Sequence, residues 1–212
     1  MAKTYGDQCA AARALDLIGE RWSLMIVREL LYGPKRFSAL HHGLPNASSA
    51  ALSQRLRDLE AGGVVRRRKL GSPTNAQVYQ LTDWGHELQP LLVLLGRWGR
   101  RAPLTPDARP VGTDSLMLAL QSHRRSPIAG NDATVAVFID DDAFTLRVTA
   151  GELTIDRGEP HDADATLTAD SATLLELIIH ERPLDELADR TRIDGDRTIL
   201  TRIFDHSTWT TP

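Results

Sequence analysis

Features that cross-link a chain, anchor it in a membrane or hold a metal are scarce in this sequence. Cys9 is the single cysteine among 212 residues, which excludes an intramolecular disulfide and suits a reducing cytosol. No apolar run reaches the roughly 18–20 residues that a membrane helix needs. The opening residues have no continuous apolar segment of the kind found in signal peptides. We therefore expect a cytoplasmic protein without a membrane partner.

Catalytic and metal-binding motifs are also missing. The histidines of the second half are scattered, with no HExxH spacing, and the chain has neither GxSxG nor a glycine-rich phosphate loop. Asp140, Asp141 and Asp142 are adjacent, but the glycine and distal glutamate of a calcium loop are absent, so a polar hairpin turn explains them better. We expect no enzymatic activity, no cofactor and no metal.

Charge is present but divided unevenly along the chain. Residues 1–104 hold 15 Lys and Arg against 8 Asp and Glu, a net charge of +7. Residues 105–212 hold 10 against 20, a net charge of −10. The division falls in a segment rich in proline, residues 101–114. We expect one domain over residues 1–102, a linker over 103–114 and a second domain over 115–212, with surfaces that face different partners.

Helical patterns dominate the first half. Apolar spacing and breakers predict helices over residues 8–18, 21–32, 37–43 and 48–61, the last one capped by Ser48 and ended by Gly62-Gly63. Two β-prone runs around the loop GSPTN predict a hairpin, and a final helix is expected over residues 83–99, with Pro90 as a kink or a delayed start. The pair 37–43 and 48–61 has the form of a helix-turn-helix unit, whose second helix enters the DNA major groove.

Polar and basic residues of this half make up a candidate DNA interface. With Leu52, Leu56 and Leu59 facing inward, the opposite face of the second helix is polar and can bond base edges and phosphates. Four consecutive cations in the hairpin do little for folding unless phosphates neutralise them, although a solvated strand is the simpler alternative. The predicted DNA-binding residues are Arg36, Ser48, Ser49, Ser53, Gln54, Arg57, Arg66, Arg67, Arg68, Lys69 and Asn75.

The stretch from Cys9 to Gly99 resembles the HxlR family of bacterial winged-helix regulators, within the MarR-like group. The matching segments are ALDLIGERWSLMIVRELLYGPKRFSAL, LSQRLRDLEAGGVVRRR, VYQLTDWGHEL and RWG. The resemblance implies a homodimer that joins through the first and last helices of this domain and binds a palindromic operator in double-stranded DNA. Ala47, Ser49 and Ala50 depart from the family pattern, so the base preference does not transfer. The broad apolar face of residues 84–99 also fits a dimer helix, unless the second domain covers it.

Cys9 is open to two interpretations. In some relatives a cysteine near this place senses electrophiles or oxidants, which requires an exposed thiol of lowered pKa. Ala10, Ala11 and Ala12 supply no charge that would lower it. This favours a packed, inert thiol over a redox sensor.

The second half alternates strands and helices. Strands are expected within TVAVFI, AFTLRVT, GELTIDRG and DATLTAD, followed by helices in SATLLELIIH and PLDELADR and a strand, turn and helix in RIDGDRTILTRIF. This order predicts an α+β domain in which helices lie on one face of an antiparallel sheet. With the mostly helical winged helix-turn-helix before it, the chain as a whole belongs to the α+β class.

The segment from about residue 115 to 206 resembles the sterol-carrier-protein type of lipid-transfer fold. AFTLRVTAGELTIDRGEPHDADATLTADSATLLELI and RIDGDRTILTRIF carry the resemblance, which implies a site for an apolar molecule between sheet and helices. The same residues equally well form a solid core. The candidate lining residues are Phe138, Phe144, Leu146, Leu153, Leu174, Ile178, Ile193, Leu200, Ile203 and Phe204.

Taken together, these features predict a homodimeric transcription regulator that binds double-stranded DNA, with a second domain that takes an apolar small-molecule effector. The alternative is a lipid or small-molecule carrier in which the winged helix mediates protein interaction. Steep salt dependence of duplex binding separates the two, because phosphate contacts release counterions.

Overall fold

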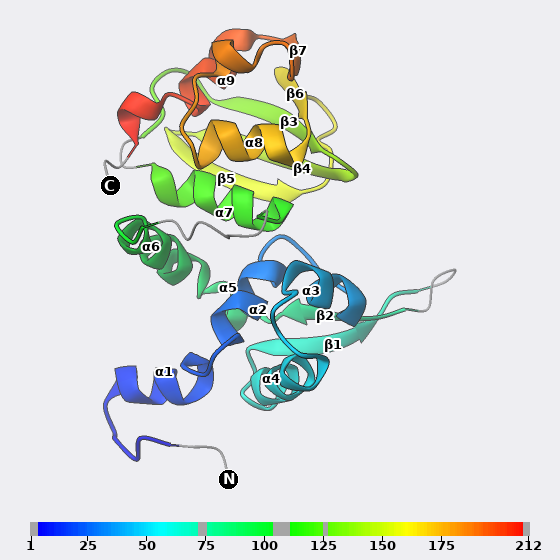
Figure 1. The fold of residues 1–212 in the computed structure, drawn as a ribbon, viewed down its shortest axis with the longest axis vertical. Coiled ribbons are helices and arrows are strands. Elements are labelled where there is room, and N and C mark those ends of the chain that lie inside the picture. The colour runs from blue at the N-terminus through cyan, green and yellow to red at the C-terminus, as the bar shows by residue number, and fades with distance from the viewer. Residues whose placement is uncertain (1–3, 72–75, 104–110, 125–126, 210–212) are drawn as a thin grey trace. The chain divides into compact units, whose positions relative to one another are not determined.

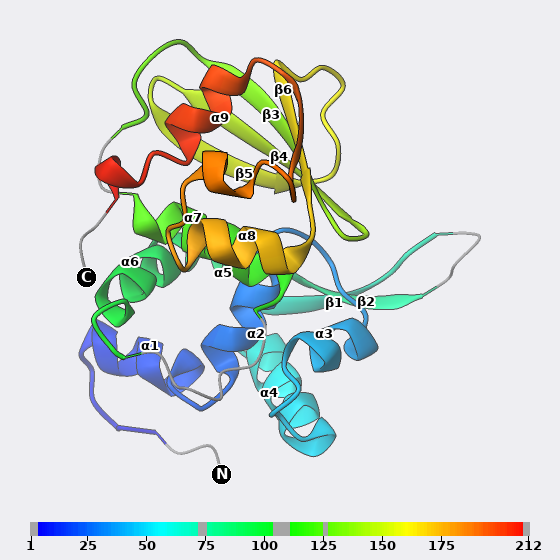
Figure 2. The same ribbon diagram turned by 45° about the horizontal axis from the view of Figure 1, so that its top comes forward.

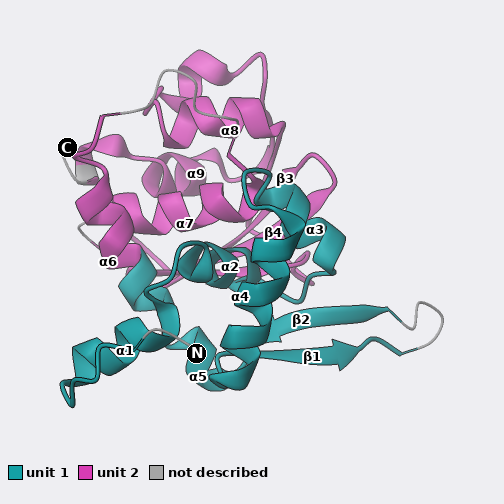
Figure 3. Ribbon diagram, turned by 60° about the horizontal axis from the view of Figure 1, so that its bottom comes forward, with its two compact units in different colours: residues 1–92 teal, residues 93–212 magenta. Residues whose placement is uncertain are grey.

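The computed structural model describes residues 4–71, 76–103, 111–124 and 127–209. The chain forms two compact units, residues 1–92 and residues 93–212 (Figure 3). The boundary lies inside a helix and ten residues before the expected end of the first domain, because the last helix of the winged helix-turn-helix region contributes to both units. Each unit has its own core.

The first unit is mostly helical with a two-stranded hairpin (Figure 1). Its core consists of aliphatic side chains from the helices and from the base of the hairpin, such as Ile26, Leu40, Leu56 and Val78. Its elements, together with the helix that crosses the boundary, are α1 (Ala10–Ile18), α2 (Ser23–Leu30), α3 (Phe37–Gly43), α4 (Ser49–Ala61), β1 (Val65–Lys69), β2 (Gln77–Leu81), α5 (Asp83–His86) and α6 (Gln89–Gly99).

Local signals place most of these boundaries. The Ser48 side chain accepts a hydrogen bond from the Ala51 N–H and caps α4, as predicted. Gly63 follows α4 with φ +75°, a conformation that glycine adopts at no steric cost. The single helix expected over residues 83–99 is instead two helices. Thr82 caps α5, and Pro90 lies in the first turn of α6, where its missing N–H costs no hydrogen bond.

The second unit combines a five-stranded sheet with helices, and α8 and α9 lie against one face of the sheet in Figures 1 and 2. The helix α7 precedes the sheet in the chain. The elements are α7 (Thr113–His123), β3 (Ala133–Ile139), β4 (Asp142–Thr149), β5 (Glu152–Arg157), β6 (Ala165–Ala169), α8 (Ser171–Ile178), η1 (Leu184–Leu187), β7 (Arg192–Gly195), α9 (Arg197–Ile203) and η2 (His206–Thr208).

The sheet has the strand order β5-β4-β3-β6-β7 and is mixed, which corrects the purely antiparallel sheet expected from the sequence. β3 pairs in parallel with β6, and the other neighbours pair antiparallel. The chain crosses to the far side of β3 after β5, and hairpin signals between consecutive strands carry no information about such a crossing. Asp140 and Asp141 form the tight turn between β3 and β4, as expected of a polar hairpin turn.

Alternation along the strands separates a core face from an outer face. Val135, Val137, Leu146 and Ile155 are buried on the side of the sheet that faces the core. Phe138 is adjacent to Val137 on the same strand, so its side chain points to the opposite face. Phe138 therefore lies on the other side of the sheet from Phe144 and Leu146, and its role as a lining residue stays a prediction.

Candidate nucleic-acid interface

A helix pair joined by a five-residue turn is the first part of the candidate site. α3 ends at Gly43 and α4 begins at Ser49. Leu52, Leu56 and Leu59 are buried at intervals of three and four residues and fix the inward face of α4. Because this face is fixed, the opposite side of α4 points outward for most of its length.

The outward side of α4 carries most of the polar residues predicted to meet DNA. Ser49, Gln54 and Arg57 are exposed and Ser53 is half-buried. Arg57 Nη2 donates to Gln54 Oε1 at 2.6 Å, and Gln54 Nε2 donates to Asp58 Oδ1 at 2.8 Å. Asp58 was not among the predicted site residues. Its position one helical turn after Gln54 was the available signal.

The hairpin β1–β2 is the second part of the candidate site. Val65 at its base is buried, whereas the four cations from Arg66 to Lys69 are exposed. Arg67 lies opposite Tyr79 in the antiparallel register, with its guanidinium carbon 5.4 Å from the centre of the Tyr79 ring. Its Nε lies 3.0 Å from Glu60 Oε2 at the end of α4. Arg67 therefore has a counter-charge in the protein already.

The other cations of the hairpin differ from Arg67. Within the described part of the chain, Arg66, Arg68 and Lys69 take part in no ion pair. Arg36 precedes α3 and is exposed as well. Asn75, the predicted residue at the hairpin tip, lies outside the described residues. Exposed cations without counter-ions are the side chains best able to neutralise phosphates.

Comparisons with known proteins agree with this geometry. A family profile described as HxlR-like helix-turn-helix matches residues 17–104. The chain is 41% identical over 86 residues to the HTH-type transcriptional regulator YvaP of Bacillus subtilis, which covers 41% of this chain and 80% of YvaP. The chain belongs to the HxlR-like helix-turn-helix family. The resemblance found in the sequence is thereby confirmed for the first domain.

A further curated relative and a solved structure are also named as transcriptional regulators. The chain is 34% identical over 94 residues to the HTH-type transcriptional regulator sll1512 of Synechocystis, covering 44% of this chain and 70% of that protein. The reduced form of the transcriptional regulator YodB from B. subtilis is a solved structure with 31% identity and a TM-score of 0.40, covering 45% of this chain and 95% of YodB. Relatives named as transcription regulators do not favour the alternative of a carrier protein.

A buried ion triad in the HxlR-like domain was not anticipated from the sequence. Glu29 in α2 has a side chain only 3% exposed, and its carboxylate lies 2.8 Å from Arg28 Nη2 and 2.7 Å from Lys35 Nζ. The Lys35 backbone also pairs with Tyr79 of β2, as a short bridge. The triad therefore ties α2 to the segment that leads into α3 and to the hairpin. The one sequence feature that could have indicated this triad is the acidic residue Glu29 among the apolar positions of α2.

Burial by itself would raise the pKa of Glu29. The positive charges of Lys35 and Arg28 outweigh this effect, so the pKa of the carboxyl lies below its ordinary value. A β-carbon on Gly43 would collide with the Glu29 carboxylate, so a side chain at the end of α3 would displace Glu29 from its place beside Arg28 and Lys35.

Cys9 is exposed at the start of α1, so the packed thiol favoured by the sequence is wrong. The backbone N–H groups of Ala11 and Ala12 face the thiol and lower its pKa. The sequence-based expectation for Cys9 rested only on charged side chains nearby, whereas this effect comes from backbone N–H groups at the start of the helix. A redox role for Cys9 stays a prediction.

The second unit holds the residues predicted to line a cavity. Phe144, Leu146, Leu174, Ile178, Leu200, Ile203 and Phe204 are buried, and Leu153 and Ile193 are half-buried. Phe204 lines a surface pocket of about 270 Å³ and Leu153 lines another of about 360 Å³. Whether an apolar molecule fits among these residues stays a prediction.

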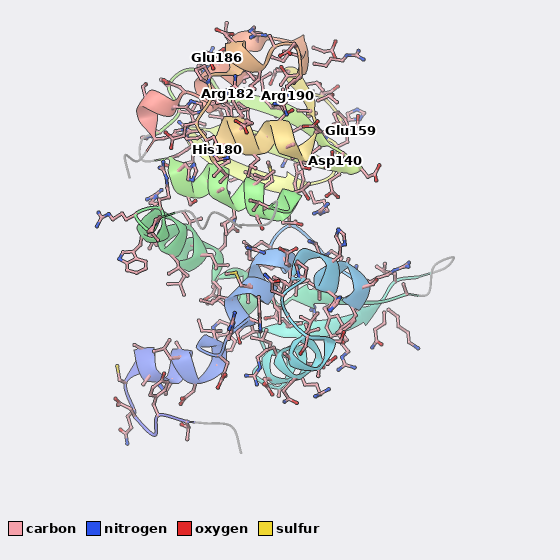
Figure 4. The ribbon with its side chains drawn as sticks, viewed as in Figure 1. Asp140, Glu159, His180, Arg182, Glu186 and Arg190 are labelled. Atoms are coloured by element: carbon pink, nitrogen blue, oxygen red, sulfur yellow. The ribbon has the colours of Figure 1, made fainter. Side chains whose placement is uncertain are left out.

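The surface of the second unit carries paired charges. Arg182 Nη2 lies 3.4 Å from Glu186 Oε2, and Arg190 Nη2 lies 3.9 Å from Asp170 Oδ1. Figure 4 labels Arg182, Glu186 and Arg190 among the side chains of this unit. Among the described residues no group of three or more His, Cys, Asp or Glu side chains is placed to hold a metal ion. No described helix is long and apolar enough to cross a membrane.

Proposed function

We propose that this protein is a transcription regulator that binds double-stranded DNA as a homodimer on a palindromic operator. One observation carries the proposal. The exposed polar side of α4 belongs to the same unit as a hairpin whose cations Arg66, Arg68 and Lys69 have no ion-pair partner among the described residues. These are the two surfaces that a winged helix-turn-helix presents to a duplex.

The two surfaces divide the work of binding. α4 enters the major groove, where Ser49, Ser53, Gln54 and Arg57 contact base edges. Ser48 and the N–H groups at the start of α4 lie where a phosphate is favoured. Arg36, Arg66, Arg68 and Lys69 contact the phosphate backbone, which supplies affinity without sequence preference.

An exposed apolar stripe on α6 supports the homodimer. Leu91, Leu94, Leu95 and Trp98 recur at intervals of three and four residues and remain exposed, Trp98 to 72% and Leu94 to 58%. Leu15 on α1 is exposed too. Monomeric proteins seldom leave such a stripe in water, and two copies related by a twofold axis would bury it. The same twofold axis implies the palindrome.

The second unit is the proposed effector domain, with the sterol-carrier-like fold that its sequence resembles. Nine of the ten predicted lining residues lie on the core side of the sheet, on α8 or α9, or directly after α9, so they gather where an apolar effector would bind. A ligand that prefers one spacing of the recognition helices changes operator affinity by about 1–3 kcal/mol. Native mass spectrometry of the purified protein tests this part, since consistently ligand-free protein would count against it.

Selection of duplexes from a randomised pool tests the regulator proposal. The expected result is enrichment of a palindrome whose half-sites lie about one helical turn apart. Pools without any enriched sequence after repeated rounds would overturn the proposal. A variant with Arg66, Arg68 and Lys69 replaced by alanine serves as the matched control, since it should bind more weakly yet enrich the same palindrome.

A further inference from the structure

We infer that Gln54 reads an adenine in the major groove, and that Asp58 is a positioning residue which, together with the hydrogen bond from Arg57, holds the Gln54 amide in the orientation this reading requires. The inference rests on the proposed function and assigns a target base to one side chain of the interface. Its basis is the chain of hydrogen bonds from Arg57 through Gln54 to Asp58 along the exposed side of α4.

The chemistry of the two partners fixes which way the Gln54 amide points. The Asp58 carboxylate is a hydrogen-bond acceptor, so the amide atom 2.8 Å from its Oδ1 must be the nitrogen. Arg57 only donates, so the atom 2.6 Å from its Nη2 must be the oxygen. If the amide were flipped, its N–H group would face the Arg57 donor and its oxygen would face the Asp58 carboxylate, so both hydrogen bonds would be lost.

Asp58 is itself held from its other side. Arg55 Nη2 lies 3.1 Å from Asp58 Oδ2, while Gln54 uses the Oδ1 atom. Arg55 also lies 3.9 Å from Glu20. The carboxylate that orients Gln54 is thus anchored by the protein before any DNA is bound, which reduces the ordering that binding would otherwise require.

The groups left over on the Gln54 amide match one base. An amide has two N–H donors and two oxygen lone pairs, and the contacts with Asp58 and Arg57 use one of each. One donor and one acceptor remain, and adenine presents the complementary N7 acceptor and N6 donor in the major groove. Guanine presents two acceptors, N7 and O6, so the amide oxygen would face another oxygen.

The position of Gln54 on the helix allows this contact. Gln54 and Arg57 are exposed, and they lie opposite the buried Leu52, Leu56 and Leu59. Asp58 lies at the side of this surface and is partly exposed. Gln54 therefore points outward from the middle of α4, while the residue that orients it stays at the edge of the DNA-facing side.

The test replaces each adenine of the selected operator in turn by 7-deazaadenine, which has a C–H at position 7 and accepts no hydrogen bond there. For the wild-type protein we expect one adenine per half-site at which this change weakens binding about 5-fold or more, because a Gln54 donor loses its partner. Replacing the same A·T pair by G·C should weaken binding about 5- to 150-fold. In Gln54→Ala, 7-deazaadenine at this position should no longer weaken binding, and the replacement of A·T by G·C should weaken binding less than it does for the wild type.

Two carboxylate variants of α4 separate positioning from charge. Asp58→Ala should tighten binding to all duplexes but reduce the adenine discrimination about 2- to 10-fold, because the amide is no longer held. Glu60→Ala removes a carboxylate that contacts Arg67 and leaves the Gln54 contacts intact, so it should keep the full discrimination. Asp58→Glu retains an acceptor of the same charge, so this variant should keep the adenine discrimination that Asp58→Ala loses. Thermal melting checks that each variant folds.

The outcomes distinguish this inference from the proposed function. If Gln54→Ala remains as sensitive as wild type to 7-deazaadenine at every position, Gln54 does not read adenine and the inference is overturned. If Asp58→Ala and Glu60→Ala keep equal discrimination, Asp58 does not position the amide and that part is overturned. If the wild-type protein selects no operator at all, the proposed function fails first.

Discussion

Arg67 in the hairpin β1–β2 and Glu60 near the end of α4 form an ion pair, with the Arg67 Nε atom 3.0 Å from the Glu60 Oε2 atom. The pair joins α4 to the hairpin, the two elements that are proposed to face DNA. One of the four hairpin cations, Arg67, is thus already neutralised within the protein. In the proposed complex, Arg66, Arg68 and Lys69 therefore supply most of the hairpin's attraction for phosphates.

Glu60→Gln should release Arg67 to a phosphate. We expect tighter binding to operator and scrambled duplexes alike, and a salt slope steeper by about 0.9 per subunit. Fluorescence anisotropy at several salt concentrations measures both quantities. Glu87→Gln is the matched control, because Glu87 is an exposed acid of the same domain that follows α5. An unchanged slope for Glu60→Gln would mean that Arg67 already contacts DNA, or never does.

Glu29→Ala should destabilise the first unit strongly. Removing Glu29 leaves Arg28 and Lys35, which are 20% and 16% exposed, without their common counter-charge. Breaking a buried ion pair in this way costs about 3–5 kcal/mol. Urea unfolding at neutral pH measures the loss. Glu20→Ala, at an exposed pair 3.9 Å long, should cost less than about 1 kcal/mol. Equal losses for the two variants would refute the importance of the triad.

The same triad predicts a dependence of stability on pH. The pKa of Glu29 is lower in the folded protein than in the unfolded chain, so its contribution is present above the unfolded value of 4.5 and is lost as pH falls through the folded pKa. Glu29→Gln should flatten the stability profile of the first unit in this acidic range. A profile identical to that of the wild type would contradict the assignment.

Some of this architecture is encoded locally and some is not. Ser48, Gly63 and Thr82 act within one helical turn, and the sequence predicts the ends of α4 and the start of α5 from them. The spacing of the leucines in α4 predicts which of its residues face outward. Contacts between residues that are distant in sequence cannot be predicted from such local patterns. Lys35 meets Tyr79 and Arg67 meets Glu60 only because the hairpin folds back against the helices.

The second unit shows the same division. The β-prone runs TVAVFI and AFTLRVT predict that β3 and β4 are strands, yet they do not reveal that β6 pairs with β3 in parallel. The face to which Phe138 points depends on the register with Ala143, which a list of apolar residues does not contain. Cys9 likewise required the helix start at Ala10 to be placed, because backbone N–H groups rather than side chains lower its pKa.

His123 predicts acid sensitivity of the second unit. Burial, with a smaller effect of Arg100, lowers the pKa of His123 from 6.5 to about 4. The unfolded chain therefore binds a proton in this pH range that the folded protein does not, and stability falls as pH drops from about 6.5 to about 4, by up to about 3 kcal/mol.

His123→Gln should weaken this pH dependence when urea unfolding is followed across the range. His161→Gln is the control, since His161 is fully exposed and should leave the profile unchanged. Parallel profiles for the wild type and His123→Gln would show that another group is responsible.

Leu94→Asp should abolish the proposed dimer. A carboxylate in the middle of the α6 stripe would be buried without a partner between two copies. Sedimentation velocity should then report a monomer, and operator affinity should fall by about 10²–10⁴ because two half-sites are no longer engaged together. His86→Asp introduces the same charge at an exposed position of α5 and should leave the dimer intact. A dimeric Leu94→Asp would place the interface elsewhere.

The salt dependence of duplex binding shows whether the exposed cations of this HxlR-like domain neutralise DNA phosphates. If Arg36, Arg66, Arg68 and Lys69 of both subunits each contact one phosphate, the logarithm of the association constant should fall with the logarithm of salt concentration with a slope of about −7. Replacing Arg66, Arg68 and Lys69 by alanine should remove most of that slope. A slope near zero for the wild-type protein, or one that the triple variant leaves unchanged, would mean that these cations do not neutralise phosphates.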